Sequence, residues 1–149
     1  MARVLVTGMS GVGKTTVLHE LSRRGHPTVD TDYDGWQLAD GTWDEPRMAQ
    51  LLASSERVVV SGTVDNQGHF YDLFEHVVLL SAPLSVLVER VSGRTDNPYG
   101  KTPEQLAAIA HHLETVEPLL RSGATLELDA RRPTSELADT IEDLLVRTL

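Results

Sequence analysis

Short apolar runs alternate with amphipathic segments along this chain. Each run is rich in valine, leucine or threonine and stops at glycine, proline or a polar residue. Runs of this kind predict strands buried on both faces of a parallel sheet. The five expected strands lie at residues 3–7, 27–29, 57–62, 76–81 and 125–128.

The segments between these strands have the apolar spacing of helices. Asp44 and Thr102 are expected N-caps, each with a proline in the first turn that follows, and Ser135 is the expected cap of the last helix. Strands that alternate with helices indicate an α/β fold, with helices on both faces of the sheet. The expected helices cover residues 16–24, 47–54, 67–75, 83–91, 102–121 and 136–147.

Residues 8–15 fit the phosphate-binding pattern G-x-x-x-x-G-K-[ST], with a strand before them and a helix after them. Glycines let backbone amides approach phosphate oxygens, and the helix N-terminus adds further donors. Lys14 is expected to reach the β- and γ-phosphates, and Thr15 to bind Mg²⁺. The alternative is a glycine-rich turn that matches by chance. The expected nucleotide-binding residues of this loop are Gly8, Ser10, Gly11, Val12, Gly13, Lys14, Thr15 and Thr16.

Composition narrows the possible partners. The 149 residues suit one domain, residues 1–149, and the net charge of −9 argues against a broad nucleic-acid surface. The chain has no cysteine, which excludes disulfides and thiol catalysis. The first strand begins almost at residue 1, and no apolar run is long enough to cross a bilayer. We therefore expect a cytoplasmic protein without a signal peptide or a membrane partner.

Polar residues follow the expected strands, where parallel sheets bind ligands. Asp30 and Asp32 stand at alternate positions after the second strand, and Gly62 ends the third. We expect Asp30 to orient Mg²⁺ or its water, and Asp32 to accept the proton of a substrate hydroxyl. The alternative is a pair of turn or N-cap residues. The third strand has no terminal aspartate for the metal, which favours the functional interpretation.

Arg90 and Arg94 lie four residues apart at the end of an expected helix, and so share one face. We expect Arg90 near adenine or the phosphates, and Arg94 on the transferring phosphoryl group, because phosphoryl transfer depends on charge neutralisation. The alternative is that both cations only stabilise the helix C-terminus.

The region after Asp32 contains candidates for acceptor binding. Trp36 and Trp43 either wall an acceptor pocket or anchor local packing, and Arg47 either holds an acidic acceptor or is exposed on its helix. Gly62 is also a candidate. For Lys101 we expect either a role in a lid or a place in a turn.

The sequence resembles small P-loop kinases of the nucleoside-monophosphate-kinase and shikimate-kinase type. The resemblance rests on four segments, residues 8–15, 30–32, 89–94 and 128–133, and covers nearly the whole chain. It implies a three-layer α/β/α fold with strand order 2-3-1-4-5. It also implies a lid at residues 93–102, an acceptor lobe at 33–53, and a loop at 129–133 that packs on adenine through Arg131 and Pro133. The third strand ends without the glycine triplet of shikimate kinases.

These patterns favour an ATP- and Mg²⁺-dependent kinase that acts, as a monomer or homodimer, on a small molecule. The acceptor would be a nucleoside, a nucleotide or a polyol-like metabolite. A non-catalytic nucleotide-binding switch or accessory protein is the alternative, although no N-K-x-D motif, which a GTP-specific switch would need, is present. A kinase for a large acceptor, such as RNA ends or a peptidoglycan sugar, is a third possibility. The acidic net charge argues against RNA.

Overall fold

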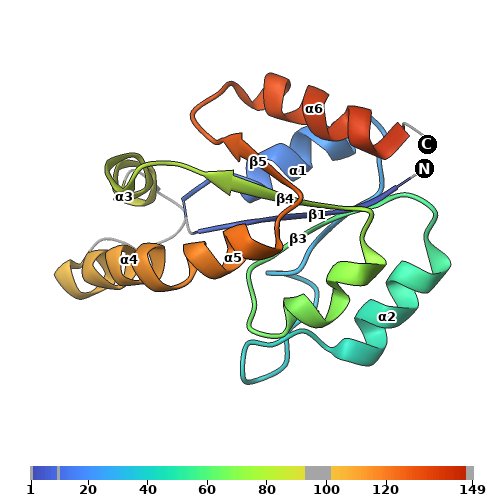
Figure 1. Cartoon of the computed structure of the whole chain (residues 1–149), viewed down its shortest axis with the longest axis horizontal. Helices are drawn as coiled ribbons and strands as arrows, with labels where there is room; N and C mark the ends of the chain where they lie inside the picture. The colour runs from blue at the N-terminus through green and yellow to red at the C-terminus, as the bar shows by residue number, and fades with distance from the viewer. Residues whose placement is uncertain (1, 10, 93–101, 147–149) are drawn as a thin grey trace.

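In the computed structural model, which describes residues 2–9, 11–92 and 102–146, five parallel strands form one sheet (Figure 1). The order is β2-β3-β1-β4-β5. Both the α/β class and the strand order are as predicted. The strands are β1 (Arg3–Gly8), β2 (Thr28–Asp30), β3 (Val58–Ser61), β4 (His76–Ser81) and β5 (Leu126–Asp129).

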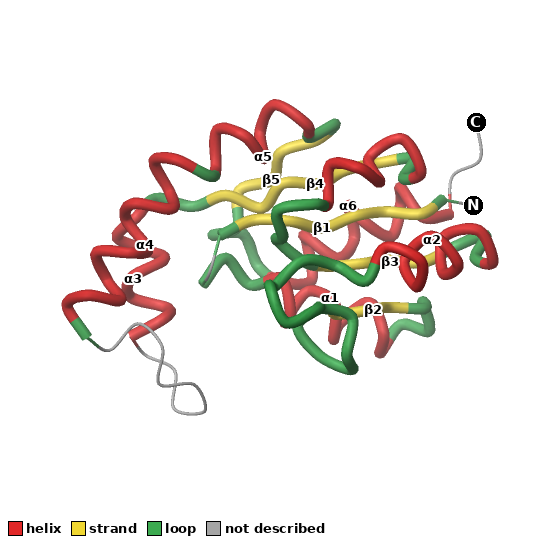
Figure 2. The backbone as a smooth tube through the Cα atoms, turned by 90° about the horizontal axis from the view of Figure 1, so that it is seen from below, coloured by secondary structure: helices red, strands yellow, loops and turns green. Residues whose placement is uncertain are grey.

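Helices cover both faces of the sheet. Helices α1 and α6 pack together on one face, and α2, η1 and α5 lie on the other (Figure 1). Helices α3 and α4 lie side by side beyond the carboxyl edge of the sheet (Figures 1 and 2). The helices are α1 (Lys14–Arg23), α2 (Glu45–Ser54), the 3-10 helix η1 (Gln67–Leu73), α3 (Leu84–Ser92), α4 (Pro103–Thr115), α5 (Glu117–Gly123) and α6 (Thr134–Val146).

Alternate residues of the central strand face two separate cores. Val4 and Val6 are buried in the larger core, which includes apolar residues of α1, α3 and α6. Leu5 points to the opposite face and packs with residues of α2, β3 and η1. This division follows from the two-residue period of a strand, and it explains why β1 and β3 read as continuous apolar runs.

Trp43 is the anchor of the second core. Its side chain is fully buried, and its ring meets Phe70 edge to face with 5.8 Å between centroids. The indole Nε1 donates to Oγ1 of Thr31 at 2.9 Å, and Thr31 donates in turn to the Ser61 carbonyl at 2.8 Å. Of the two sequence-based alternatives for Trp43, the structure supports the packing anchor.

Several helix boundaries follow the sequence. Asp44 caps α2 by accepting from the Arg47 amide at 3.2 Å, and Thr102 caps α4 by accepting from the Gln105 amide at 3.2 Å. The last helix begins at Thr134, so Ser135 lies inside it and the predicted Ser135 cap is wrong. The Pro133 carbonyl accepts the first-turn amides of that helix instead.

The expected helix over residues 102–121 is two helices, which meet at Val116. Pro118 explains the break, because proline has no amide hydrogen and its ring clashes with the carbonyl four residues earlier. Residues 67–73 form a 3-10 helix, two residues shorter than the helix expected there. The predicted lid lies, except for Thr102, outside the described residues. Within the described ranges, no helix is long and apolar enough to cross a membrane.

We predict that Trp43→Ala lowers the free energy of unfolding by about 3–5 kcal/mol, because it leaves a large cavity in the second core and removes the indole donor to Thr31. Urea unfolding followed by circular dichroism measures the change. Leu38→Ala is the matched control, since Leu38 lies in the same loop region and is 52% exposed. Its effect should stay within about 0.5 kcal/mol. Similar losses for both variants would contradict an anchoring role for Trp43.

Candidate active site

The loop between β1 and α1 has the backbone of a phosphate-binding loop. Gly13, directly before α1, has a left-handed φ of 98° and no side chain to cap the helix. The first amides of α1 are therefore left for another acceptor, such as an anion. At Gly8 a Cβ atom would lie 2.5 Å from the carbonyl oxygen of Leu80 in β4. The loop thus requires glycine at both positions.

Lys14 begins α1, and its side chain folds back over this loop. The Nζ atom donates to the Gly8 carbonyl at 2.7 Å and lies 3.4 Å from the Met9 carbonyl oxygen. Lys14 also lines a cavity of about 300 Å³, together with Asp32. The ammonium therefore lies between the loop and a cavity.

The two predicted metal ligands lie within hydrogen-bonding distance of each other. Thr15 follows Lys14 in α1, and its hydroxyl donates to Oδ2 of Asp30, the last residue of β2, at 2.8 Å. A hydroxyl and a carboxylate are hard oxygen ligands, and Mg²⁺ in nucleotide sites usually takes one or two such protein ligands beside phosphate and water. This pair fits that ligand set.

The side chains of Asp32 and Asp30 contact different groups. The Asp32 amide donates to Oδ1 of Asp30 at 3.1 Å, and Oδ1 of Asp32 accepts from Nε2 of Gln37 at 3.2 Å. Its side chain lines the cavity that contains Lys14. The two carboxylates are therefore separated: Asp30 lies beside Thr15, and Asp32 lies at a cavity.

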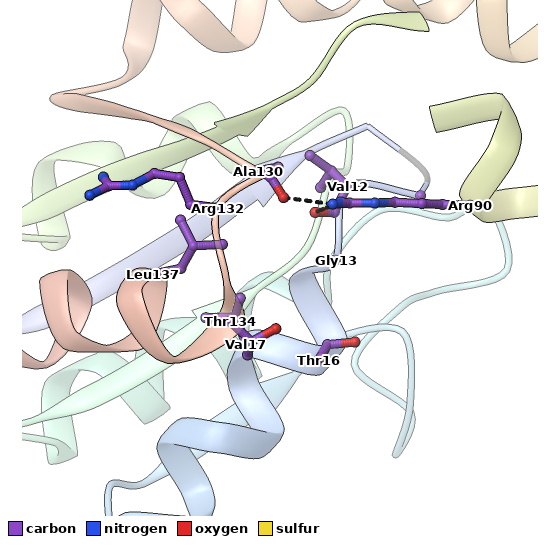
Figure 3. Close-up of a pocket in the computed structure, with 10 residues that line it drawn as sticks. Val12, Gly13, Thr16, Val17, Arg90, Ala130, Arg132, Thr134 and Leu137 are labelled. Atoms are coloured by element: carbon purple, nitrogen blue, oxygen red, sulfur yellow. Dashed lines mark hydrogen bonds between the residues drawn. The ribbon is translucent and has the colours of Figure 1, made fainter. Parts of the chain in front are cut away.

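A second cavity, of about 360 Å³, lies between the phosphate-binding loop, α3 and the start of α6 (Figure 3). Arg90 of α3 spans it. One guanidinium nitrogen donates to the Val12 carbonyl at 3.2 Å, and another donates to the Ala130 carbonyl at 2.8 Å. Arg90 thus ties the loop to the segment before α6. The lining residues are Gly11, Val12, Gly13, Thr16, Val17, Arg90, Ala130, Arg132, Thr134 and Leu137.

Arg131 and Pro133, which the resemblance places at adenine, lie in the segment that leads into α6. Neither residue lines the cavity beside Arg90; Arg132 lies there, with its guanidinium directed away from Arg90 (Figure 3). Arg131 instead pairs with Asp129 at 2.8 Å, and both line a separate cavity. The hydrogen bond from Arg131 lowers the pKa of Asp129 to about 2. Arg131 lies two residues after Asp129, and both its amide and its guanidinium donate to the Asp129 carboxylate, which keeps its side chain out of the cavity beside Arg90.

The cavity beside Lys14 also contains residues that the sequence analysis did not single out. Thr63, Val64 and Asp65 directly follow Gly62, so the strand-end rule that selected Gly62 could have reached them. No sequence signal points to the α4 and α5 residues. The cavity is lined by Gly8, Met9, Lys14, Asp32, Thr63, Val64, Asp65, His112, Val116 and Leu120.

The other acceptor candidates have contacts elsewhere in the structure. Trp36 is buried in the second core, and the Arg47 guanidinium stacks on its ring, 3.9 Å from the centroid. The same guanidinium donates to the Asp34 carbonyl at 2.8 Å. Gly62 packs tightly against Thr31 and Trp43, where a Cβ atom does not fit. None of these three candidates is among the residues that line the cavity.

Three of the predicted residues, Ser10, Arg94 and Lys101, lie outside the described residues. Their roles remain predictions.

A family model described as an AAA domain matches residues 4–111. A nucleotide-binding protein of Rhodospirillum rubrum is 33% identical to this chain, over an alignment that covers 51% of the chain and 29% of the relative. The chain therefore spans less than a third of that curated relative's length.

Solved structures share the fold over almost the whole chain. A shikimate kinase from Acinetobacter baumannii, in complex with shikimate, superposes with a TM-score of 0.74, at 20% identity, over 98% of this chain and 93% of that one. A gluconokinase from Sinorhizobium meliloti superposes with a TM-score of 0.58, at 21% identity, over 92% and 87%. The fold is that of the small P-loop kinases.

We predict that Arg90→Met lowers the free energy of unfolding by about 1–3 kcal/mol, because two partly buried carbonyls lose a charged donor. Methionine keeps most of the apolar stem, so packing changes little. Arg132→Met is the control, since Arg132 lines the same cavity and, among the described residues, its side chain makes a 3.5 Å ion pair with Glu136 on the surface. Its cost should be below about 0.5 kcal/mol. Equal costs in urea unfolding would show that Arg90 does not brace the loop.

Proposed function

The chain belongs to the AAA-domain family, and from this membership and the geometry of the site we propose that it is an ATP- and Mg²⁺-dependent small-molecule kinase. It would transfer the γ-phosphoryl group of ATP to a hydroxyl or phosphate of its acceptor. The observation that carries the proposal is the joint position of Lys14 and Asp32 at one cavity, next to the Thr15–Asp30 pair. In this proposal Lys14 is the cation that binds the transferring group, and Asp32 is the base for the acceptor. The Thr15–Asp30 pair beside them would hold the metal.

The arrangement suggests a division of tasks. The amides of residues 11–15 and the Lys14 ammonium would bind the phosphates, and nucleoside binding would fall to the cavity beside Arg90. Mg²⁺, when held by Thr15 and Asp30, would neutralise phosphate charge. Asp32 would accept the proton of the acceptor hydroxyl while the hydroxyl oxygen forms a bond to the γ-phosphorus. The bond from that phosphorus to the bridging oxygen would break, and ADP would leave.

The size of the cavity beside Lys14 favours a small acceptor. A volume of about 300 Å³ lies at the lower end of the range for sites that enclose small ligands. The fold relatives described as shikimate kinase and gluconokinase agree with this class of acceptor. An RNA end or a cell-wall polymer would need a longer groove than this cavity offers.

A nucleotide-binding protein without transfer activity is the second candidate, and the relative from Rhodospirillum rubrum is described only as a nucleotide-binding protein. The two candidates differ in one observable. A kinase releases ADP faster when its acceptor is added, whereas a binding protein retains ATP or hydrolyses it at a rate that no acceptor changes.

We predict that a metabolite screen that reads ADP release identifies at least one acceptor, and that Lys14→Ala loses about 10²–10³-fold in turnover of it. The loss follows from removing the only described cation that stands at both the loop and the cavity. Arg23→Ala is the control, since Arg23 lies on the same helix with its side chain 73% exposed. Both variants should keep the wild-type circular dichroism spectrum. Wild-type turnover in Lys14→Ala, or ATP binding without any acceptor-dependent release, would overturn the kinase proposal.

We predict that Asp32→Asn lowers kcat by about 10²–10⁴-fold and leaves the Kd for ATP unchanged, because asparagine keeps the shape but cannot accept the proton. Calorimetric titration with ATP, paired with the ADP-release assay, separates binding from chemistry. Asp34→Asn, in the same loop, is the matched control and should retain activity. An unchanged kcat would reduce Asp32 to a loop residue.

Asp30→Asn tests the other carboxylate through a different readout. It should raise the Mg²⁺ concentration for half-maximal rate by about ten-fold, because a neutral amide replaces a charged oxygen ligand. Saturating Mg²⁺ should then restore much of the rate in Asp30→Asn but not in Asp32→Asn. If neither variant responds to Mg²⁺, the Thr15–Asp30 pair is structural and the metal assignment fails.

A further inference from the structure

We infer that the acceptor carries no negative charge, and that Asp65 selects a neutral or amine-bearing polyhydroxyl molecule. This inference rests on the proposed function. It adds the chemical class of the acceptor and a specificity residue that the sequence did not indicate.

The first argument is the sign of the charge around the cavity. Of the described residues that line it, Asp32 and Asp65 are carboxylates and Lys14 is the lone ammonium. Bound ATP would engage Lys14 and would itself bring further negative charge, even with Mg²⁺. An anionic acceptor would then meet like charges on both sides, and like charges at close range are a strong means of rejecting a ligand.

The second argument is the position of Arg47, the candidate for holding an acidic acceptor. Its guanidinium stacks on Trp36 and donates to the carbonyl of Asp34, and its side chain does not line the cavity. To bind an acceptor carboxylate, Arg47 would have to give up both contacts. Within the described parts of the chain, no arginine lines this cavity.

The third argument is the state of Asp65 itself. Its carboxylate makes no hydrogen bond or ion pair within the described residues, although it is exposed at a cavity wall. The segment that carries it is held in place. Thr63 donates to the Gly8 carbonyl at 2.6 Å, and the Val64 amide donates to Oε1 of Gln67 at 3.0 Å. Asp65 thus offers a positioned acceptor for a hydroxyl or an ammonium group.

The remaining lining fits the carbon skeleton of such a molecule. Val64, Val116 and Leu120 supply apolar surface, and His112 of α4 adds a ring nitrogen that can donate or accept. Sites for small polar molecules commonly combine an apolar wall with a few placed polar groups.

Matched acceptors test the inference directly. Each set keeps one carbon skeleton and varies one group: glucitol, glucamine and gluconate form one set, and nucleosides with their monophosphates form others. In any set that supports ADP release, the neutral or amine-bearing member should have a kcat/KM at least ten-fold higher than the anionic member. A higher value for the anionic member would overturn the inference while leaving the kinase proposal intact. If ATP binds but no set, and no other compound in the metabolite screen, supports ADP release, then the inference and the kinase proposal both fail.

Variants of Asp65 provide the second test. Asp65→Asn should raise the KM of the preferred acceptor about ten-fold, with kcat and the KM for ATP unchanged. Asp65→Lys should narrow or reverse the ten-fold preference against the anionic member. Asp72→Asn is the control, because Asp72 is an exposed carboxylate of η1 that does not line the cavity. Unchanged acceptor KM in Asp65→Asn, with unchanged preference in Asp65→Lys, would remove Asp65 from acceptor recognition.

Discussion

The carbonyl oxygen of Gly8 accepts two short hydrogen bonds, and the arrangement of the site depends on them. Nζ of Lys14 donates from one side at 2.7 Å, and Oγ1 of Thr63 donates from the other at 2.6 Å. The first bond holds the phosphate-binding lysine over its loop. The second ties the segment after β3, which carries Asp65, to the end of β1. The groups proposed for phosphate binding and for acceptor recognition are therefore tied to the same backbone atom, so neither segment can move far without the other.

The main features of the fold were predictable because strong local signals agree with each other. Continuous apolar runs such as that of β3 mark strands with two buried faces, and proline with a capping residue marks the starts of α2 and α4. The glycine spacing of the phosphate-binding loop is as specific, since Gly8 and Gly13 occupy backbone positions that other residues do not fit. The single helix expected over residues 102–121 was wrong, although Pro118 is a local signal for the break at Val116, because proline cannot continue a helix from the preceding turn.

The side of the site that faces the acceptor was less predictable, because it depends on contacts between distant segments. Asp65 and His112 meet at one cavity from a loop after β3 and from α4, and no spacing in the sequence brings them together. Arg131 illustrates the same limit on a smaller scale. Its position beside Asp129 allows a local ion pair, and this short-range contact competes with the longer reach toward a base. The resemblance supplied a role for the residue but not its rotamer.

The two cavities beside the loop differ in the charge of the side chains around them. Arg90 and Arg132 line the cavity proposed for the nucleoside, whereas Asp32 and Asp65 line the one proposed for the acceptor. The transferring phosphoryl group would leave the loop amides and the Lys14 ammonium and approach the carboxylates of the acceptor cavity, which is unfavourable unless the acceptor oxygen lies between the group and those carboxylates. Asp32, by taking a proton from that oxygen, would lose its own charge at the moment of transfer. The same carboxylate that would repel a phosphate before the reaction would therefore tolerate one as it forms.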